Sequence, residues 1–264
     1  MTRTSLLTLL LLAVASDAAA RYPISPYSLR QLHAGADLIV IAVVEERNVV
    51  DTTVIQTLTV ERTLKGTPPE ATLRVETSTL IECPAPAEYV VGTRVLTFLT
   101  AEEPDGRRFP FGMSYAVREL ADALPKSLET RLVELDRLAA VEDPEVRERA
   151  TIEWLVASTE DPATRFDALR DLASPNRKGP LVVEPDFAIA LTLEQRDRLH
   201  RLLSDSTLDG LESYWTASIL AAATGSAELT AIAQHLLLRP TEKRLAQLRE
   251  FSAIYLSLPS PGAR

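Results

Sequence analysis

The sequence predicts an α+β protein in which a five-stranded antiparallel β-barrel is followed by an all-α domain of helical hairpins. Two observations carry this prediction. Between Asp37 and about Val117, apolar side chains recur at every second residue, which is the period of a β-strand. After Leu120 they recur at every third or fourth residue, which is the period of a helix that packs against a core.

Residues 1–20 precede both regions and have the pattern of a secretory signal peptide. Arg3 comes before the apolar stretch Leu6–Ala15, and Ala18, Ala19 and Ala20 supply the small residues of a cleavage site. The stretch is short for a membrane span, although a membrane anchor is the alternative. The only cysteine is Cys83, so the chain lacks the cysteine of a lipoprotein cleavage site. We therefore expect a periplasmic or extracellular protein with no membrane span after cleavage.

Residues 21–120 are expected to form the strand domain. Ala36–Glu46 is a continuous apolar run, typical of a strand that is covered on both faces. The next two strands, near residues 53–64 and 72–76, alternate apolar residues with threonine and charged residues, and Thr93–Thr100 is a fourth strand. The fifth is Arg107–Val117, in which the alternating residues are Phe109, Phe111, Met113, Tyr115 and Val117.

The connections between these strands are short and rich in turn residues, as at Thr67–Pro69 and Glu103–Gly106. Parallel strands need long crossover connections, so the spacing excludes a parallel nucleotide-binding sheet. Five short antiparallel strands have exposed edges, and closure into a barrel is one way to protect them.

Residues 121–258 are expected to form six or seven helices, with a disordered tail at 259–264. Asp143-Pro144 and Asp161-Pro162 each place an N-cap acid before a proline, and Thr192 with Gln195 fits a capping box. The phrases DPEVRERATIEWL and DPATRFDALRDL begin 18 residues apart, at Asp143 and Asp161, which is one helix and a turn. The spacing is similar to HEAT-type hairpins, and a plain helical bundle is the alternative. The segment 174–185 interrupts the series and either carries function or routes the chain around the bundle.

The composition argues against several classes of partner. The chain has 28 basic and 37 acidic residues and a net charge of −9, so it lacks the basic face of a nucleic-acid binder. The same charge disfavours an anionic membrane surface. Cys83 is either a buried apolar group or a free thiol that pairs between chains.

Few residues suggest chemistry. His33, His200 and His235 lie in separate segments without the spacing of a zinc motif. Glu102–Gly106 lacks the alternating oxygen ligands of a calcium loop. We therefore assign no catalytic, cofactor-binding or metal-binding residue and expect no cofactor. The aromatic residues Phe109, Phe111 and Tyr115 could stack on bases or sugars but also suit a barrel interior, and Trp154 and Trp215 suit helix packing.

One motif supports an alternative enzymatic function. GMSYA (Gly112–Ala116) is close to the G-x-S-x-G nucleophile elbow, so Ser114 would be the nucleophile of a serine hydrolase with His200 or His235 as base. Such an elbow joins a strand to a helix in a parallel sheet, whereas Ser114 falls inside an alternating run. The sequence therefore favours a protein that is not an enzyme.

The order ADLIVIAVVEE, VERTLKG and ECPAPAEYVVGTRVLTFL resembles the netrin-like (NTR) modules related to tissue inhibitors of metalloproteinases. The resemblance covers about a third of the chain and implies an OB-type barrel. The inhibitors chelate zinc through an amino-terminal cysteine, but the expected terminus here is Arg21, so inhibition of metalloproteinases does not carry over. Within the barrel, Gly66 would permit a corner between strands, and Lys65 would be a solvated charge rather than part of a phosphate loop.

These observations predict an exported, non-enzymatic binding or scaffold protein that recognises a protein or an envelope component. A serine hydrolase using Ser114 and a protease-inhibitor-like module are the alternatives.

Overall fold

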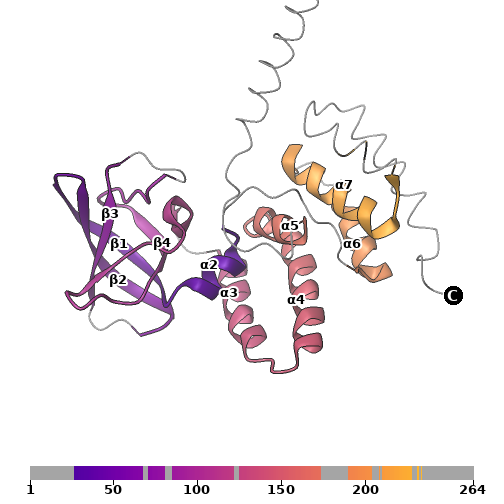
Figure 1. The fold of residues 1–264 in the computed structure, drawn as a ribbon, viewed down its shortest axis with the longest axis horizontal. Coiled ribbons are helices and arrows are strands. Elements are labelled where there is room, and N and C mark those ends of the chain that lie inside the picture. The colour runs from indigo at the N-terminus through magenta and orange to yellow at the C-terminus, as the bar shows by residue number, and fades with distance from the viewer. Residues whose placement is uncertain are drawn as a thin grey trace, which may run out of the picture.

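The structure is a computed structural model that describes residues 27–67, 71–80, 85–121, 125–173, 190–203, 208, 210–227, 231 and 233. The expected signal peptide (1–20), Cys83, His235, the segment 174–185 and the tail 259–264 lie outside these residues. A β-sheet lies at one end of the molecule, and helices α6 (Leu193–Leu202) and α7 (Gly210–Thr224) lie at the other (Figure 1). In the described part of the chain, no helix has the length and hydrophobicity that crossing a bilayer requires.

The sheet is mixed and has six strands in the order β5-β3-β2-β1-β4-β6. The neighbouring strands are antiparallel except β3 and β5, which are parallel. The strands are β1 (Leu38–Val50), β2 (Thr53–Lys65), β3 (Thr72–Ser78), β4 (Arg94–Leu99), β5 (Arg107–Arg108) and β6 (Val117–Leu120). The first four agree in place with the strands expected from the alternating pattern.

The prediction of a closed, five-stranded antiparallel barrel is wrong, because the six-stranded sheet stays open and one of its strand pairs is parallel. The expected fifth strand is instead divided into β5, a 3₁₀ helix η1 (Met113–Ala116) and β6. Pro110 has no N–H to donate, and Gly112 and Met113 have φ angles of 97° and 57°, which no strand adopts. Between β5 and η1, the backbone pairs with β4 at an isolated bridge, between Leu99 and Pro110, and β6 then pairs with β4 in a regular antiparallel ladder.

The first half of β1, Leu38–Val44, is apolar without interruption because both of its faces are covered. Leu38 and Val40 face an inner core that includes the buried Tyr89. Ile39 and Ile41 face the opposite way, into a second core that also contains Leu29 and continues through the helices. The prediction that this run is covered on both faces is therefore confirmed for Leu38–Val44, whereas Glu45 and Glu46 at its end are exposed.

The remaining helices are α2 (Leu29–Gly35), α3 (Lys126–Ala139), α4 (Pro144–Thr159) and α5 (Arg165–Ala173). Two expected starts are confirmed: Asp143 caps α4 with proline at its first turn, and Thr192 with Gln195 forms a capping box on α6. At Asp161 the carboxylate accepts a hydrogen bond from Ala163, but α5 begins only at Arg165, after a turn. Helices α2 and α3 lie between the sheet and α4 (Figure 1).

Candidate functional site

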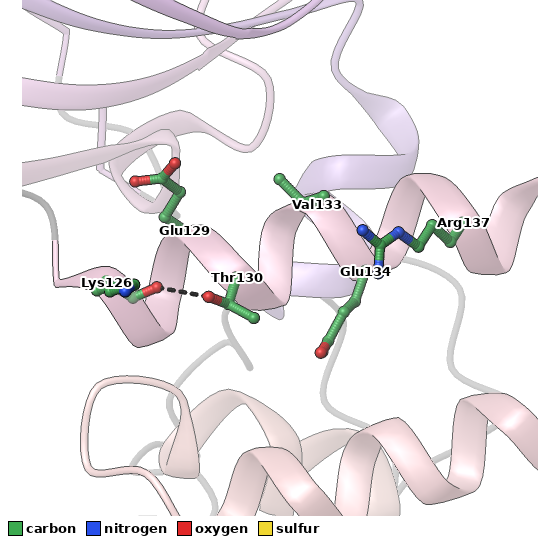
Figure 2. Close-up of a pocket in the computed structure, with 6 residues that line it drawn as sticks. All are labelled: Lys126, Glu129, Thr130, Val133, Glu134 and Arg137. Carbon is green, nitrogen blue, oxygen red and sulfur yellow. Dashed lines mark hydrogen bonds between the residues drawn. The ribbon is translucent and has the colours of Figure 1, made fainter.

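The candidate site is a shallow groove of about 350 Å³ along the outer face of α3. The opposite face of this helix buries Leu128, Leu132 and Leu135 in the helical core, so the amphipathic pattern fixes which stripe is exposed. The residues that line the groove are spaced three or four apart and therefore share one side of the helix. They are Lys126, Glu129, Thr130, Val133, Glu134 and Arg137 (Figure 2).

Arginines from outside the stripe already neutralise both carboxylates of the groove. Arg62 of β2 donates to Glu129 with an N–O distance of 3.0 Å, and Arg131 donates to Glu134 at 2.7 Å. The hydrogen bond from Arg62 also lowers the pKa of Glu129, so this carboxylate is ionised and engaged at neutral pH. The acidic residues of the groove therefore contribute little free negative charge.

Unlike the two carboxylates, the basic residues at the two ends of the groove are not neutralised by an ion pair within the described structure. Within the described part of the chain, no carboxylate forms an ion pair with Lys126 or Arg137. Val133 lies between them and is 42% exposed. Figure 2 shows Lys126 and Arg137 at opposite ends of the helical stripe, with Val133 and Thr130 between them. Among the described residues, the groove thus has an apolar centre between two positive charges that form no ion pair, although the charge of Lys126 contributes to the lowered pKa of Glu129.

The length of the groove sets the size of a ligand. Lys126 and Arg137 are three helical turns apart, which corresponds to about 16 Å along the axis. An extended peptide covers this length with about five residues. Such a shallow, open groove suits a segment of a macromolecule better than a small molecule, which usually binds in an enclosed, mostly apolar pocket.

A histidine–carboxylate pair lies where α2 meets α3. His33 Nε2 is 3.1 Å from Oδ1 of Asp136, and the His33 side chain is almost fully buried. Burial lowers the pKa of His33, the Asp136 carboxylate opposes this shift, and the charge of Lys65 adds to it. The two residues are more than a hundred positions apart, so their pairing carried no local signal in the sequence.

Lys65 and Gly66 form the corner after β2. The Lys65 ammonium group donates to the carbonyl oxygens of His33 and Ala36, at 2.6 and 2.7 Å. Lys65 therefore satisfies carbonyls at the end of α2, and the expectation of a solvated charge is wrong. Gly66 has a φ of 76°, as the expected corner requires.

Two buried aspartates of α5 hold the start of α2. Asp171 accepts hydrogen bonds from Ser28 Oγ at 2.8 Å and Arg30 Nε at 2.9 Å. Asp167 accepts from the backbone N–H of Leu29 at 3.0 Å. Burial raises the pKa of Asp171, although Arg30 and Ser28 oppose the shift. All these donors lie at the start of α2, so the two aspartates connect α5 to α2 rather than bind a ligand.

The structure does not bring together Ser114 and His200, the two described residues of the hydrolase alternative. Ser114 lies in η1, where its backbone N–H donates to Ala85 O at 3.0 Å, and η1 packs on β4 and β6. His200 belongs to α6, at the other end of the molecule from β4 (Figure 1). His235 is outside the described residues.

The other residues that the sequence singled out have structural neighbours. Phe111 and Tyr115 pack against the helical core, Trp154 is buried, and Trp215 lies 5.0 Å from the ring of Phe166. In the acidic turn, Asp105 and Glu102 pair with Arg107 and Arg108. Among the described residues, no group of three histidine, cysteine, aspartate or glutamate side chains is close enough to hold a metal ion.

Comparison of the sequence with models of known protein families finds no match, and comparison with curated proteins finds none. The resemblance to NTR-like modules and to HEAT-type hairpins stays a prediction. The sequence analysis did not predict the α3 groove, because a helical period identifies the buried stripe and does not mark a binding surface on the exposed side. Val133, an apolar residue on that exposed side, was the available signal.

Proposed function

We propose that the protein is an exported, non-enzymatic binding or scaffold protein and that the α3 groove receives an acidic segment of a partner protein. The observation that carries the proposal is the exposed Val133 between Lys126 and Arg137, two cations without an ion pair among the described residues. The pattern of residues 1–20 supports export.

The chemistry of the groove defines the partner segment. It would carry two carboxylates roughly 16 Å apart, to meet Lys126 and Arg137, with an aliphatic side chain between them for Val133. Because the protein as a whole has a net charge of −9, the basic groove would attract an acidic ligand only at short range. Affinity would therefore fall as the salt concentration rises.

Two matched variants test the proposal. Val133→Asp places a negative charge in the groove, whereas Val146→Asp makes the same change on α4, where the valine is 43% exposed. The probe is a fluorescent, amidated heptapeptide with glutamate near each end and leucine at its centre, followed by fluorescence anisotropy. We expect Val133→Asp to weaken binding at least tenfold and Val146→Asp to leave it within about twofold.

A photoreactive residue in place of Thr130 tests the same site in the native envelope, with Thr151 of α4 as the control position. A partner that crosslinks at Thr130 and is displaced by the acidic peptide supports the proposal. Equal crosslinking at both positions, or equal weakening by both aspartate variants, contradicts it.

A further inference from the structure

The second half of β1 has a free edge. Strand β4 pairs with β1 only from Leu38 to Val43, and Gly92 and Thr93 extend this contact by one residue, to Val44. Beyond that point, Glu45–Val50 form backbone hydrogen bonds only with β2, as far as the described residues are concerned. About half of the backbone N–H and C=O groups in this stretch therefore point away from β2 and have no partner among the described residues.

The side chains of this stretch are also available. All six residues from Glu45 to Val50 are exposed, although they belong to a regular strand. Val49 and Val50 are 48% and 63% exposed. Leu80, which is 50% exposed, follows Thr79, and the N–H of Thr79 donates to Thr52 O in the turn between β1 and β2. An apolar tip therefore adjoins the free edge.

Charge divides the free edge into two parts. Glu45 and Glu46 have no ion pair or side-chain hydrogen bond within the described structure. They lie at the end of the edge near the middle of the sheet, and the two valines lie at its tip. Figure 1 shows this hairpin of β1 and β2 at the end of the sheet that is remote from the labelled helices, so none of the described helices covers it.

We propose that Glu45–Val50 binds an extended segment of a partner protein, which adds to the sheet as an antiparallel strand. Its backbone would bond the free groups of β1, its first residues would be aliphatic, opposite Val50 and Val49, and its last would be basic, opposite Glu46 and Glu45. This edge is separate from the α3 groove and does not depend on the function proposed for it. The protein would then have one binding surface on its helices and another on its sheet.

A second copy of this chain is the less favourable occupant. Two molecules that each carry a net charge of −9 repel one another. An antiparallel pair of identical edges would also place Glu45 opposite Val50 and Glu46 opposite Val49, so no acidic residue would face a basic one directly. A bulge at Glu45, where the register with β2 shifts, further discourages pairing between flat, identical edges.

The test uses the full chain and the acetylated, amidated peptide Val-Ile-Thr-Glu-Lys-Lys, which is complementary to Val50 through Glu45. A reversed-charge peptide, Val-Ile-Thr-Lys-Glu-Glu, and a copy of the first peptide with alternate N-methylated amides are the controls. Hydrogen exchange of Glu45–Val50 is measured with each peptide, and binding is measured by calorimetry. We expect the first peptide to slow exchange at these amides at least fivefold and both controls to bind at least tenfold more weakly.

Charge exchange on the protein completes the test. In the double variant Glu45→Lys and Glu46→Lys, the reversed-charge peptide should become the tighter ligand, while Val133→Asp should leave peptide binding unchanged. The proposal is overturned if the N-methylated peptide binds as well as the first, or if protection appears elsewhere on the protein. It is also overturned if Glu45–Val50 become protected in the absence of peptide as the protein concentration rises, because a second copy would then occupy the edge.

Discussion

Arg118 of β6 and Asp167 of α5 connect the sheet to the helices, with Nη2 of the arginine 2.8 Å from Oδ2 of the aspartate. The second oxygen of Asp167 accepts the N–H of Leu29 at the start of α2. One carboxylate thus joins a strand, the short helix α2 and a helix of the core. Asp171, one turn further along α5, repeats the contact through Ser28 and Arg30.

Loss of this carboxylate should destabilise the whole fold. Asp167→Ala leaves the buried N–H of Leu29 and the Arg118 guanidinium without their acceptor, so we expect the free energy of unfolding to fall by about 2–3 kcal/mol. Urea denaturation followed by circular dichroism measures the change. Asp197→Ala, at an exposed position of α6, is the control and should stay within about 0.5 kcal/mol of the wild type. A similar small loss for Asp167→Ala would show that the junction is not stabilised by these bonds.

Substitutions at two glycines with similar φ angles can distinguish the cost of backbone strain from the cost of a steric clash. Gly66 and Gly92 have φ angles of 76° and 84°. A Cβ on Gly66 would lie 2.3 Å from Asp37 O, whereas one on Gly92 would meet nothing within 4 Å. We expect Gly92→Ala to cost about 1 kcal/mol from its backbone and Gly66→Ala at least twice as much, as measured by thermal unfolding. Equal losses would mean that the corner yields easily at Asp37.

The Lys65 cap offers a third test. Lys65→Met keeps the aliphatic stem but leaves the carbonyls of His33 and Ala36 without the ammonium donor. We expect a loss of about 1–2 kcal/mol in the free energy of unfolding. Lys126→Met, on the exposed start of α3, removes a charge without such a cap and should change stability little. If the two variants lose the same amount, Lys65 acts only through its charge.

Local patterns in the sequence predicted most of the elements. The alternation from Val54 to Leu64 gave β2, and the caps at Asp143 and Thr192 gave the starts of α4 and α6. Such signals depend on residues that are close in the chain. The same reasoning failed at Arg107–Val117, where Phe109 to Val117 alternate but Gly112 and Met113 turn the backbone into η1. Alternation reports which side chains are apolar and does not report a left-handed φ.

The arrangement of those elements depended on pairs that are distant in the chain. The contacts of Asp167 with Leu29, of Asp136 with His33 and of Lys65 with Ala36 join residues that no periodic pattern relates. The α3 groove depends on which residues remain exposed after the helices pack. The only signal for it in the sequence was therefore the apolar Val133. The sequence likewise did not predict the open edge of β1, because this edge depends on where β4 ends.

The hydrolase alternative has a direct test. Because Ser114 and His200 lie on elements at opposite ends of the molecule, we expect a fluorophosphonate probe not to label the full-length protein. Labelling by mass spectrometry is compared between wild type and Ser114→Ala, with a known serine hydrolase as positive control. Labelling that disappears in the variant would contradict the proposal of a non-enzymatic protein.

Protonation of His33 should make stability depend on pH. Burial lowers the pKa of this imidazole below its ordinary 6.5, so the folded protein takes up the proton less readily than the unfolded chain does. The unfolded state therefore binds more protons below about pH 6.5, and the free energy of unfolding should rise with pH up to that value and then level off. Urea denaturation between about pH 5 and 8 measures this rise.

Two substitutions isolate the contribution of His33 from that of other titrating groups, since each is compared with the wild type at the same pH. His33→Gln keeps a hydrogen-bond donor toward Asp136 and cannot titrate, so the difference in stability from the wild type should shrink as pH falls. Asp136→Asn removes the group that opposes the effect of burial on the pKa of His33, so it should steepen the loss of stability toward low pH. A difference between His33→Gln and the wild type that stays constant across the range would mean that His33 has the same pKa in both states.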